Sequence, residues 1–316
     1  MQTSTTDKPL TLTVLGAGAW GSVLTELVHR NSHRRQQNVH LWSRQHGTPL
    51  ETLLTSSNIV VSAISMSGVA EVASRVAQHG LPANTILVSA TKGLDLATTC
   101  TASQVWQTMF PRHPVVVLSG PNLAKEIQLG LPAATVVASK DEAAARLVQQ
   151  AFASDRFRVY TNTDPLGTEL GGTLKNVIAI AVGVCDGLQL GTNAKSALIT
   201  RSLTEIIRVG TYLGGDTETF FGLSGLGDLL ATCNSPLSRN YQVGFKLAEG
   251  KTLPQTLAEI GETAEGVNTA NVLYALSQRE SIPMPISYLV YLLLNGNITP
   301  QQAVEALMER DLKAEK

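Results

Sequence analysis

The sequence predicts an α/β fold in two parts, a doubly wound parallel sheet followed by an all-helical domain. In the first half, short runs rich in β-branched residues alternate with helical patterns, which is typical of a parallel sheet with buried strands. Beyond Asp164 we find no convincing strand, and helical patterns continue to the end of the chain. We therefore expect one domain at residues 1–164 and a second at residues 165–316.

The individual elements follow from the same patterns. The expected strands are Leu10–Leu15, Val39–Trp42, Ile59–Ile64, Thr85–Ser89, Val115–Leu118, Thr135–Ala138 and Phe157–Tyr160. The expected helices between them are Trp20–Arg30, Gly68–His79, Thr98–Phe110 and Asp141–Ala153. The second part begins where Thr163 or Asp164 can cap a helix and Pro165 suits its first turn. Its expected helices are Pro165–Leu188, Asn193–Leu213, Asn240–Glu249, Gly266–Glu280, Ile286–Asn295 and Pro300–Arg310.

Composition excludes several classes of function. The net charge is −1, so no general attraction to nucleic acid or to an anionic membrane is expected. Cys100, Cys185 and Cys233 are too few and too scattered for a disulfide framework or a metal site, so we expect no metal. No secretory signal is visible, and no apolar run reaches the ~18 residues of a membrane span. We expect a cytoplasmic protein without integral membrane association.

A glycine-rich turn follows the first strand and opens a helix. In Gly16-Ala17-Gly18-Ala19-Trp20-Gly21, Gly16 allows the tight turn, Gly18 lets the backbone approach a pyrophosphate, and Gly21 lets helix and strand pack closely. The helix N-terminus then favours the anion. This context favours a Rossmann-type dinucleotide site over a glycine-rich turn in an unliganded sheet protein.

The end of the second strand bears on the choice of cofactor. An NAD-specific site usually offers an acidic residue there, to the ribose 2′-hydroxyl. This chain offers Ser43 and Arg44, which suit a 2′-phosphate and predict that NADP is accepted. The alternative is that Arg44 is an exposed loop arginine.

Lys175 precedes a long apolar run, separated from it by Asn176 alone. Burying an unpaired ammonium group costs several kcal/mol. Either desolvation lowers the pKa of Lys175, or a carboxylate such as Asp228 holds it charged, and in both cases it can exchange a proton with a substrate hydroxyl. All six histidines lie in the first 113 residues, which makes Lys175 the best base in the second part. The alternatives are a snorkelling lysine and a structural Lys–Asp pair.

Four further stretches combine polar side chains with glycine or with a helix start. Ser89–Gly93 and Ser119–Asn122 each follow a strand, where parallel sheets present ligand groups. Gly222–Leu229 places one carboxylate after what we expect to be a flexible loop. Ser235–Asn240 presents Ser, Arg and Asn at a helix start, which can hold a phosphate.

These motifs together resemble the bacterial NAD(P)-dependent glycerol-3-phosphate dehydrogenases over nearly the whole chain. GAGAWG, ATKGLD, SGPNLAKEI, GGTLKNVIAIAVG, GLSGLGDLLATC and SRN occur in that family's order. The resemblance implies a Rossmann domain joined to a helical domain like that of 6-phosphogluconate dehydrogenase. It also implies interconversion of dihydroxyacetone phosphate and sn-glycerol 3-phosphate for glycerophospholipid synthesis, with NADP or NAD as cofactor.

The resemblance also implies roles for individual residues. Lys175 would accept the proton in the oxidation, Asp228 would orient it and bind substrate, and Lys92 would contact both cofactor and substrate. The other implied substrate contacts are Gly120, Asn122, Asn176, Ser238, Arg239 and Asn240. The implied dinucleotide contacts are Gly16, Gly18, Ala19, Trp20, Gly21, Arg44, Lys92, Ala124, Arg239, Thr263 and Glu265.

The chain departs from the family pattern in two places that matter. Only Gln45–Asn58 separates Arg44 from the third strand, which is short for the family and leaves the preference between NADP and NAD open. Asn122 stands where the family commonly has Ser. The competing hypotheses are a β-hydroxyacid or ketopantoate-type reductase on the same fold, and a dinucleotide-sensing protein without turnover. The apolar stretch Tyr288–Leu294 fits either a homodimer contact or the core.

Overall fold

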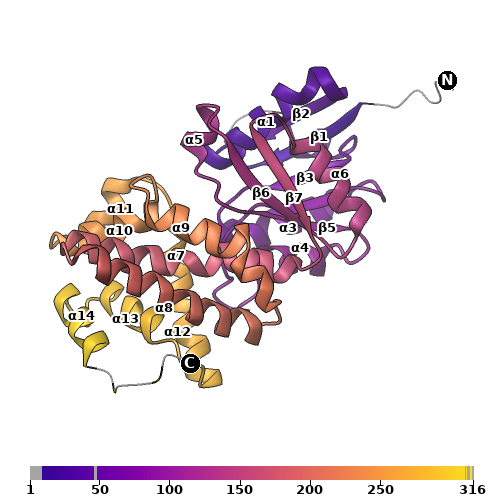
Figure 1. Ribbon diagram of the computed structural model, residues 1–316. Coiled ribbons are helices and arrows are strands. Elements are labelled where there is room, and N and C mark those ends of the chain that lie inside the picture. Colours follow the sequence, from indigo (N-terminus) through magenta and orange to yellow (C-terminus); the bar gives the residue numbers. More distant parts are fainter. Residues whose placement is uncertain (1–8, 46–47, 310, 312–313, 315–316) are drawn as a thin grey trace. The chain divides into compact units, whose positions relative to one another are not determined.

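The computed structural model describes residues 9–45, 48–309, 311 and 314 (Figure 1). The chain divides into two compact units. The first comprises Met1–Thr91 and Ala102–Pro165, and the second comprises Lys92–Thr101 and Leu166–Lys316. Lys92–Thr101 follows a strand of the first unit along the chain, yet it packs with the helices of the second.

The first unit contains a seven-stranded sheet in the order β2-β1-β3-β4-β5-β6-β7. The strands are β1 Leu10–Leu15, β2 Gln37–Trp42, β3 Ile59–Ser62, β4 Ile86–Ser89, β5 Val115–Ser119, β6 Ala133–Ala138 and β7 Phe157–Asn162. Every residue of β3 and β4 is buried, as the continuous apolar runs predicted. The register places Val14 beside Val61, and Val61 beside Val88.

One pair of strands is antiparallel, so the expectation of a wholly parallel sheet is wrong at this point. Ser119 at the end of β5 lies opposite Val136 of β6, which runs back along β5. A parallel return needs a connection, usually an α-helix, that runs back along the strand to the starting edge of the sheet. The helix between β5 and β6, α5 Ala124–Gln128, has 5 residues and spans only ~7.5 Å, about half the length of β5, and the chain turns back directly.

Helices cover both faces of the sheet and create two separate apolar cores. The helices of this unit are α1 Ala19–Arg35, α2 Leu50–Leu54, α3 Met66–His79, α4 Ala102–Met109, α5 Ala124–Gln128 and α6 Glu142–Phe152. Side chains of α1 and α6 pack on one face with Leu12 and Val14, and side chains of α2, α3 and α4 pack on the other with Leu15 and Val60. The doubly wound architecture is therefore confirmed.

The topology places the glycine-rich turn at the switch point of the sheet. β2 lies on one side of β1 and β3 lies on the other, so the connections leaving these strands diverge at the carboxyl end of β1. Ligands bind at such a point in open α/β sheets. Gly16, Gly18 and Gly21 follow β1 directly.

The second unit is helical. Its elements are α7 Pro165–Gly187, α8 Gly191–Tyr212, the 3-10 turn η1 Thr217–Phe221, the π-helix η2 Leu223–Gly227, α9 Asp228–Cys233, α10 Arg239–Ala248, α11 Leu253–Ile260, α12 Glu265–Glu280, α13 Pro285–Leu294 and α14 Pro300–Met308. α7 is the central helix, because nearly all of its residues from Gly167 to Cys185 are buried. By length and composition alone α7 could cross a membrane, although charged residues such as Lys175 interrupt its apolar run, and 83% of its most apolar window is buried inside the protein, as in a core helix.

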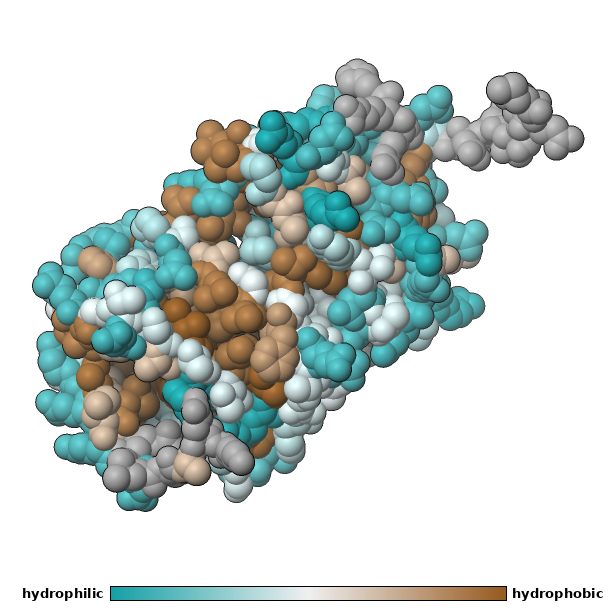
Figure 2. Space-filling view, in the orientation of Figure 1, coloured by the Kyte–Doolittle hydropathy of each residue, from teal (hydrophilic) through white to brown (hydrophobic). Residues whose placement is uncertain are grey.

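The apolar stretch near residue 290 belongs to the core of this unit. Ile286, Val290, Leu293 and Leu294 of α13 are buried in its apolar cluster. Tyr288 on the same helix is 40% exposed. Figure 2 shows further apolar residues gathered on the visible face of the helical unit. The core interpretation therefore accounts for most of α13.

Leu223–Leu229 is helical, so the flexible loop expected over Gly222–Leu229 is wrong. η2 leads directly into α9, and its glycines serve close packing. A Cβ on Gly225 would collide with the backbone of Phe220, and a Cβ on Gly171 of α7 would lie 2.8 Å from the carbonyl oxygen of Ser224. Glycine here lets two backbones touch, which the sequence pattern alone does not distinguish from a loop.

Candidate active site

The glycine-rich turn has the geometry of a pyrophosphate cradle. Gly16 has a φ of +113°, and a Cβ there would lie 2.6 Å from the carbonyl oxygen of Ala63. A Cβ on Gly21 would collide with the Gly16 carbonyl, whereas one on Gly18 would find no atom within 4 Å. The turn is exposed at Gly18 and Ala19, where α1 begins. Packing thus requires two of the glycines, and Gly18 is left open for an anion at the helix N-terminus.

Arg44 lies two residues after β2 and makes a weak contact on the surface. Its Nη1 is 3.6 Å from Glu71 Oε2, and both side chains are about two-thirds exposed or more. An ion pair of this kind contributes little to stability, so a phosphate could take its place. Trp20, by contrast, is half-buried and packs against the apolar core of the sheet.

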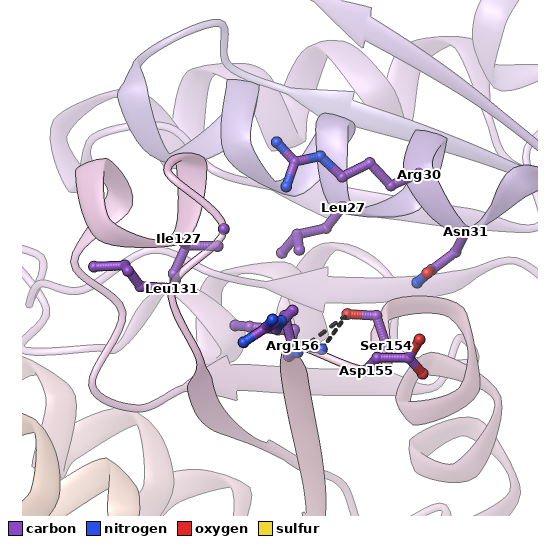
Figure 3. Close-up of a pocket in the computed structure, with 10 residues that line it drawn as sticks. Leu27, Arg30, Asn31, Ile127, Leu131, Ser154, Asp155 and Arg156 are labelled. Carbon is purple, nitrogen blue, oxygen red and sulfur yellow. Dashed lines mark hydrogen bonds between the residues drawn. The ribbon is translucent and has the colours of Figure 1, made fainter.

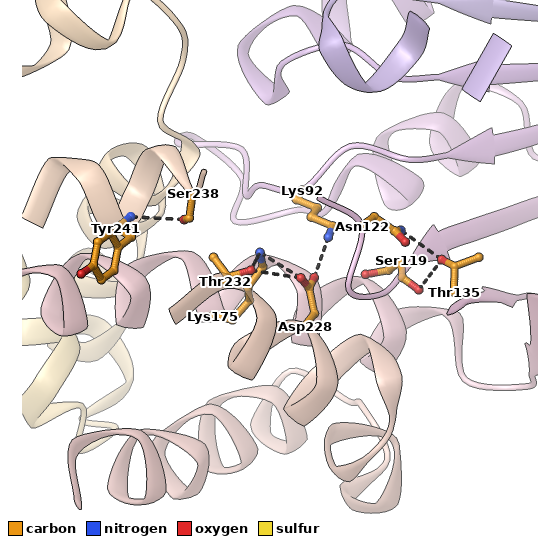
Figure 4. A network of polar contacts seen from close by, with 9 residues as sticks. All are labelled: Lys92, Ser119, Asn122, Thr135, Lys175, Asp228, Thr232, Ser238 and Tyr241. Carbon is orange, nitrogen blue, oxygen red and sulfur yellow. Dashed lines mark hydrogen bonds and ion pairs between the residues drawn. The ribbon is translucent and has the colours of Figure 1, made fainter. Parts of the chain in front are cut away.

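The carboxyl end of β5 holds a short chain of hydrogen bonds (Figure 4). Asn122 Nδ2 donates to Thr135 Oγ1 at 3.0 Å, and Thr135 Oγ1 donates to the Ser119 carbonyl at 3.1 Å. Asn122 Oδ1 and Ser119 Oγ are buried without a hydrogen-bond partner among the described residues. Buried polar atoms without partners are costly, and a ligand can supply the missing bonds. Gly120 and Ala124, the first residue of α5, flank Asn122 in the chain.

The helical unit brings two lysines onto one buried carboxylate (Figure 4). Lys92 Nζ lies 2.5 Å from Asp228 Oδ2, and Lys175 Nζ lies 3.1 Å from Asp228 Oδ1. Lys175 Nζ also donates to Thr232 Oγ1 at 2.5 Å, and Thr232 Oγ1 donates to Asp228 Oδ1 at 3.2 Å. The Lys175 side chain is 7% exposed, so the snorkelling interpretation is wrong.

Burial decides the acidity of this lysine. Desolvation lowers the pKa of Lys175 to about 8, the negative charge of Asp228 opposes that shift, and the positive charge of Lys92 adds to it. At neutral pH the three charged groups sum to +1 while Lys175 is protonated. The amine can therefore lose and regain a proton near physiological pH, which is the property of a general acid and base.

Local packing explains how these residues meet. Lys175 is in the middle of α7, and the contact between Gly171 and the Ser224 backbone sets the start of η2 against that helix. Asp228 is the first residue of α9, and Thr232 follows it by four residues, on the same helix face. Single turns of π-helix are frequent at functional sites. Thr232 was not predicted from sequence, because its spacing from Asp228 has meaning only if the segment is helical.

Lys92 reaches Asp228 through a segment anchored in the helical unit. Leu94 is completely buried in that unit's core, and its carbonyl accepts a hydrogen bond from Asn268 Nδ2 at 2.9 Å. Asp95 Oδ1 accepts bonds from the amides of Ala97 and Thr98, which forms a turn. The helix expected from Thr98 therefore begins only at Ala102.

The Ser-Arg-Asn group starts α10, as the sequence predicts. Ser238 is the N-cap, and its Oγ accepts from the Tyr241 amide at 3.2 Å. Arg239 is 46% exposed and pairs with Glu262 at 3.1 Å. Asn240 is buried, and its Oδ1 accepts from the Gly266 amide at 2.9 Å, so this side chain caps α12.

The remaining predicted residues lie beside this group. A Cβ on Gly266 would lie 2.6 Å from the carbonyl oxygen of Asn176, which is itself buried on α7. Glu265 is the first residue of α12, and Thr263 precedes it by two. The structure thus brings Asn176, Asn240 and the start of α12 together.

A cavity of about 210 Å³ in the first unit is not part of this chemistry (Figure 3). Its lining includes Leu27, Arg30 and Asn31 from the C-terminal half of α1, whereas the glycine-rich turn lies at the N-terminus of that helix. Arg30 is already bonded to Glu26 and to the Gln128 carbonyl. Among the described residues, no cluster of three or more His, Cys, Asp or Glu could hold a metal ion.

Comparison with known proteins identifies the family. The family called NAD-dependent glycerol-3-phosphate dehydrogenase matches with its N-terminus at residues 45–145 and its C-terminus at residues 164–305. A glycerol-3-phosphate dehydrogenase (NAD(P)+) of Acaryochloris marina is 62% identical over 304 residues, which are 96% of this chain and 97% of that protein. The chain belongs to the NAD-dependent glycerol-3-phosphate dehydrogenase family.

Other members of the glycerol-3-phosphate dehydrogenase family agree in sequence and in fold. The enzyme of the same name from Synechocystis sp. is 59% identical over 315 residues, covering 100% of this chain and 98% of its own. The crystal structure of glycerol-3-phosphate dehydrogenase from Coxiella burnetii superimposes with a TM-score of 0.89 at 34% identity, covering 96% of this chain and 100% of that one. The predicted family and the predicted Rossmann-type fold with a helical C-terminal part are confirmed.

Proposed function

We propose that this chain interconverts dihydroxyacetone phosphate and sn-glycerol 3-phosphate, with NADP or NAD as cofactor. The relatives that share most of its length carry the name glycerol-3-phosphate dehydrogenase (NAD(P)+), which supports both the reaction and the cofactors. The observation that carries the proposal is the buried amine of Lys175, held by Asp228 and Thr232 and poised to change its charge near pH 8. Such a group serves a reaction in which a hydroxyl gains or loses a proton.

Lys175 provides the acid and base of the reaction. When bound, the reduced dinucleotide supplies the hydride that converts the ketone carbon to an alcohol carbon. Protonated Lys175 donates its proton to the oxygen of that carbon as negative charge develops there. In the oxidation direction, neutral Lys175 accepts the same proton. A pKa of about 8 keeps both forms available to the enzyme.

Asp228 and Lys92 supply the electrostatic setting. The buried carboxylate of Asp228 pairs with both ammonium groups. Its negative charge limits the fall in the pKa of Lys175, so the amine can be protonated again after each turnover. Lys92, whose side chain is 20% exposed, keeps a positive charge beside the substrate oxygen and stabilises the developing alkoxide. Thr232 fixes the direction of the Lys175 amine. We assign Lys175, Asp228 and Lys92 to catalysis.

The start of α10 is proposed to hold the substrate phosphate. The Arg239 guanidinium pairs with the exposed carboxylate of Glu262, which a phosphate can replace, and the Ser238 hydroxyl still has a proton to donate. Asn240 has its oxygen committed to Gly266, so it can contribute only its amide hydrogens. Further substrate contacts are assigned to Lys92, Gly120, Asn122, Asn176 and Asp228. Binding the phosphate orients the reacting carbon, since remote binding energy can be used for positioning.

The pyrophosphate and the adenosine part of the dinucleotide are proposed to bind the first unit. The open position of Gly18 at the start of α1 suits the pyrophosphate, and Arg44 suits a 2′-phosphate. The other proposed contacts are Gly16, Ala19, Trp20, Gly21, Lys92, Ala124, Arg239, Thr263 and Glu265. We accordingly propose residues 1–164 as the dinucleotide-binding domain and residues 165–316 as the substrate-binding domain. A role in glycerophospholipid synthesis follows from the proposed product. A cytoplasmic location and a homodimer stay predictions.

The test compares substrates with the purified protein. Oxidation of NADPH and of NADH is followed at 340 nm with dihydroxyacetone phosphate and, separately, with a panel of 2-keto and 3-keto acids. We expect turnover with the phosphorylated ketone and none above background with the acids. Turnover of a keto acid alone would favour the β-hydroxyacid or ketopantoate-type alternative, and cofactor binding without any turnover would favour the sensing protein.

A further inference from the structure

The helical unit contains a second, half-buried polar cluster that the proposed mechanism does not use. Asp186 Oδ2 accepts hydrogen bonds from Lys195 Nζ at 2.7 Å and from the Tyr241 hydroxyl at 2.8 Å. The Lys195 ammonium also lies 5.8 Å from the centre of the Tyr241 ring. Asp186 is in the last turn of α7, where the helix dipole disfavours a negative charge. The carboxylate of Asp186 is therefore stabilised there by its two hydrogen-bond donors rather than by the helix.

The helices that this cluster joins pack through glycine. A Cβ on Gly183 of α7 would collide with the Tyr241 carbonyl, and a Cβ on Gly244 of α10 would collide with the Ile180 carbonyl. One on Gly187 would lie 3.0 Å from the Phe245 carbonyl. Glycines allow the two backbones to touch, and Val243 and Leu247 of α10 pack with Ile180 of α7 in the apolar core. Apolar contacts are non-directional, so a polar bond adds a defined position of α10 along α7.

The Tyr241 hydroxyl makes that contact at the functional end of α10. Tyr241 is the third residue of the helix, and its amide donates to Ser238 Oγ in the same turn (Figure 4). Burial and the bond to Asp186 raise the pKa of Tyr241 well above its ordinary value, so the hydroxyl remains a donor. Asp186 lies 11 residues beyond Lys175 on α7, or ~16 Å along the axis. One helix thus carries both the reactive amine and the anchor of the phosphate-binding turn.

We infer that Asp186, Tyr241 and Lys195 form a positioning network that fixes α10 along α7 and so sets the distance from the phosphate-binding turn to the Lys175 amine. The inference rests on the proposed function, because the distance between the start of α10 and the Lys175 amine matters only if one binds the substrate phosphate and the other protonates the substrate. Tyr241 and Asp186 act through Arg239 and Lys175 and touch no substrate. The distance that the network sets would suit a substrate in which one CH2 group and one ester oxygen separate the ketone carbon from the phosphorus atom.

The experiment compares two ketones that differ only in the phosphate. The rate constant kcat/KM is measured for dihydroxyacetone phosphate and for dihydroxyacetone, with saturating NADPH, and the ratio of the two is the readout. Tyr241→Phe removes one hydroxyl and keeps the ring. We expect this ratio to fall about tenfold, because a hydrogen bond to a charged group is lost and only the phosphorylated substrate uses the spacing.

A matched control is available in the same unit. The Tyr212 hydroxyl donates to Glu280 Oε2 at 2.6 Å on the exposed surface, so Tyr212→Phe deletes an equivalent bond away from α10. It should leave the ratio unchanged. Asp186→Ala should reproduce the effect of Tyr241→Phe, and Asp186→Asn, which keeps an oxygen acceptor, should restore most of the ratio.

The outcomes separate this inference from the proposed function. If the wild-type protein does not reduce dihydroxyacetone phosphate, the proposed function itself is refuted. Active wild-type protein with an unchanged ratio in Tyr241→Phe, or an equal loss for both ketones, would overturn the positioning network alone. Failure of Asp186→Asn to improve on Asp186→Ala would also overturn it. Melting temperatures of all variants identify any loss that comes from unfolding.

Discussion

Replacing Asp228 by Asn changes the charge next to Lys175 while keeping the side-chain shape. Asp228 Oδ1 lies 3.1 Å from the Lys175 amine, and an opposite charge within a few ångströms shifts a pKa by ~1–3 units. Removing that charge should lower the pKa of Lys175 from about 8 to ~6, taking the middle of that range. The protonated fraction at pH 7.5 then falls from about three-quarters to about 3%, so ketone reduction slows about 25-fold at this pH beyond any loss at its optimum.

Lys92→Met provides a perturbation of opposite sign. The positive charge of Lys92 lowers the pKa of Lys175, so its removal should raise that pKa, by about one unit. The assay is kcat for reduction of dihydroxyacetone phosphate between pH 5.5 and 9.5, and each variant's pH profile is compared with that of wild type, because ionisation of the substrate affects all of them equally. Reduction needs the protonated amine, so the descending limb should move to lower pH in Asp228→Asn and to higher pH in Lys92→Met. Limbs that stay in place, or that both move the same way, would refute the electrostatic assignment.

Three further predictions concern the cofactor and the scaffold. A Cβ on Gly18 finds no atom within 4 Å, so Gly18→Ala should melt close to wild type while its affinity for NADPH, measured by fluorescence titration, falls at least about tenfold. Undiminished affinity would exclude the glycine turn as the pyrophosphate site. Arg44→Ala should raise KM for NADPH about tenfold and leave KM for NADH unchanged, and an equal effect on both would remove the 2′-phosphate contact. Glu205 is buried on α8 and accepts three hydrogen bonds at the start of α13, from the amides of Ile286 and Ser287 and from the Ser287 hydroxyl. Glu205→Ala should therefore lower the free energy of unfolding, measured by urea titration, by at least ~2 kcal/mol. Glu205→Gln, which keeps an acceptor, should cost less, and equal losses would argue against this capping role.

The regular elements of the sheet could be predicted from sequence because each signal is local. A buried strand such as Ile59–Ser62 carries its own apolar run, and the glycine turn carries its own spacing. The reversal at β6 could not be predicted, because strand direction depends on how the short segment around α5 packs and leaves no periodic signal in β6 itself.

The site shows the same division between local and non-local information. The conflict between the charge of Lys175 and the apolar run beside it is visible in the sequence, and it correctly indicated a buried, paired amine. The contribution of Thr232 is not visible, since glycines that allow η2 to touch α7 look the same in sequence as glycines of a loop. The commitment of Asn240 to the α12 N-terminus is equally non-local, because its partner Gly266 lies 26 residues away.

The most direct test of the central claim is the turnover of Lys175→Met, which removes the amine and largely fills its volume. General acid–base catalysis contributes ~10²–10⁴ to a rate, so kcat for dihydroxyacetone phosphate reduction should fall about a thousandfold. The dissociation constant for NADPH should stay within about twofold of wild type, because the glycine turn is untouched. A variant that retains a tenth or more of wild-type kcat would contradict the assignment of Lys175 as the proton donor.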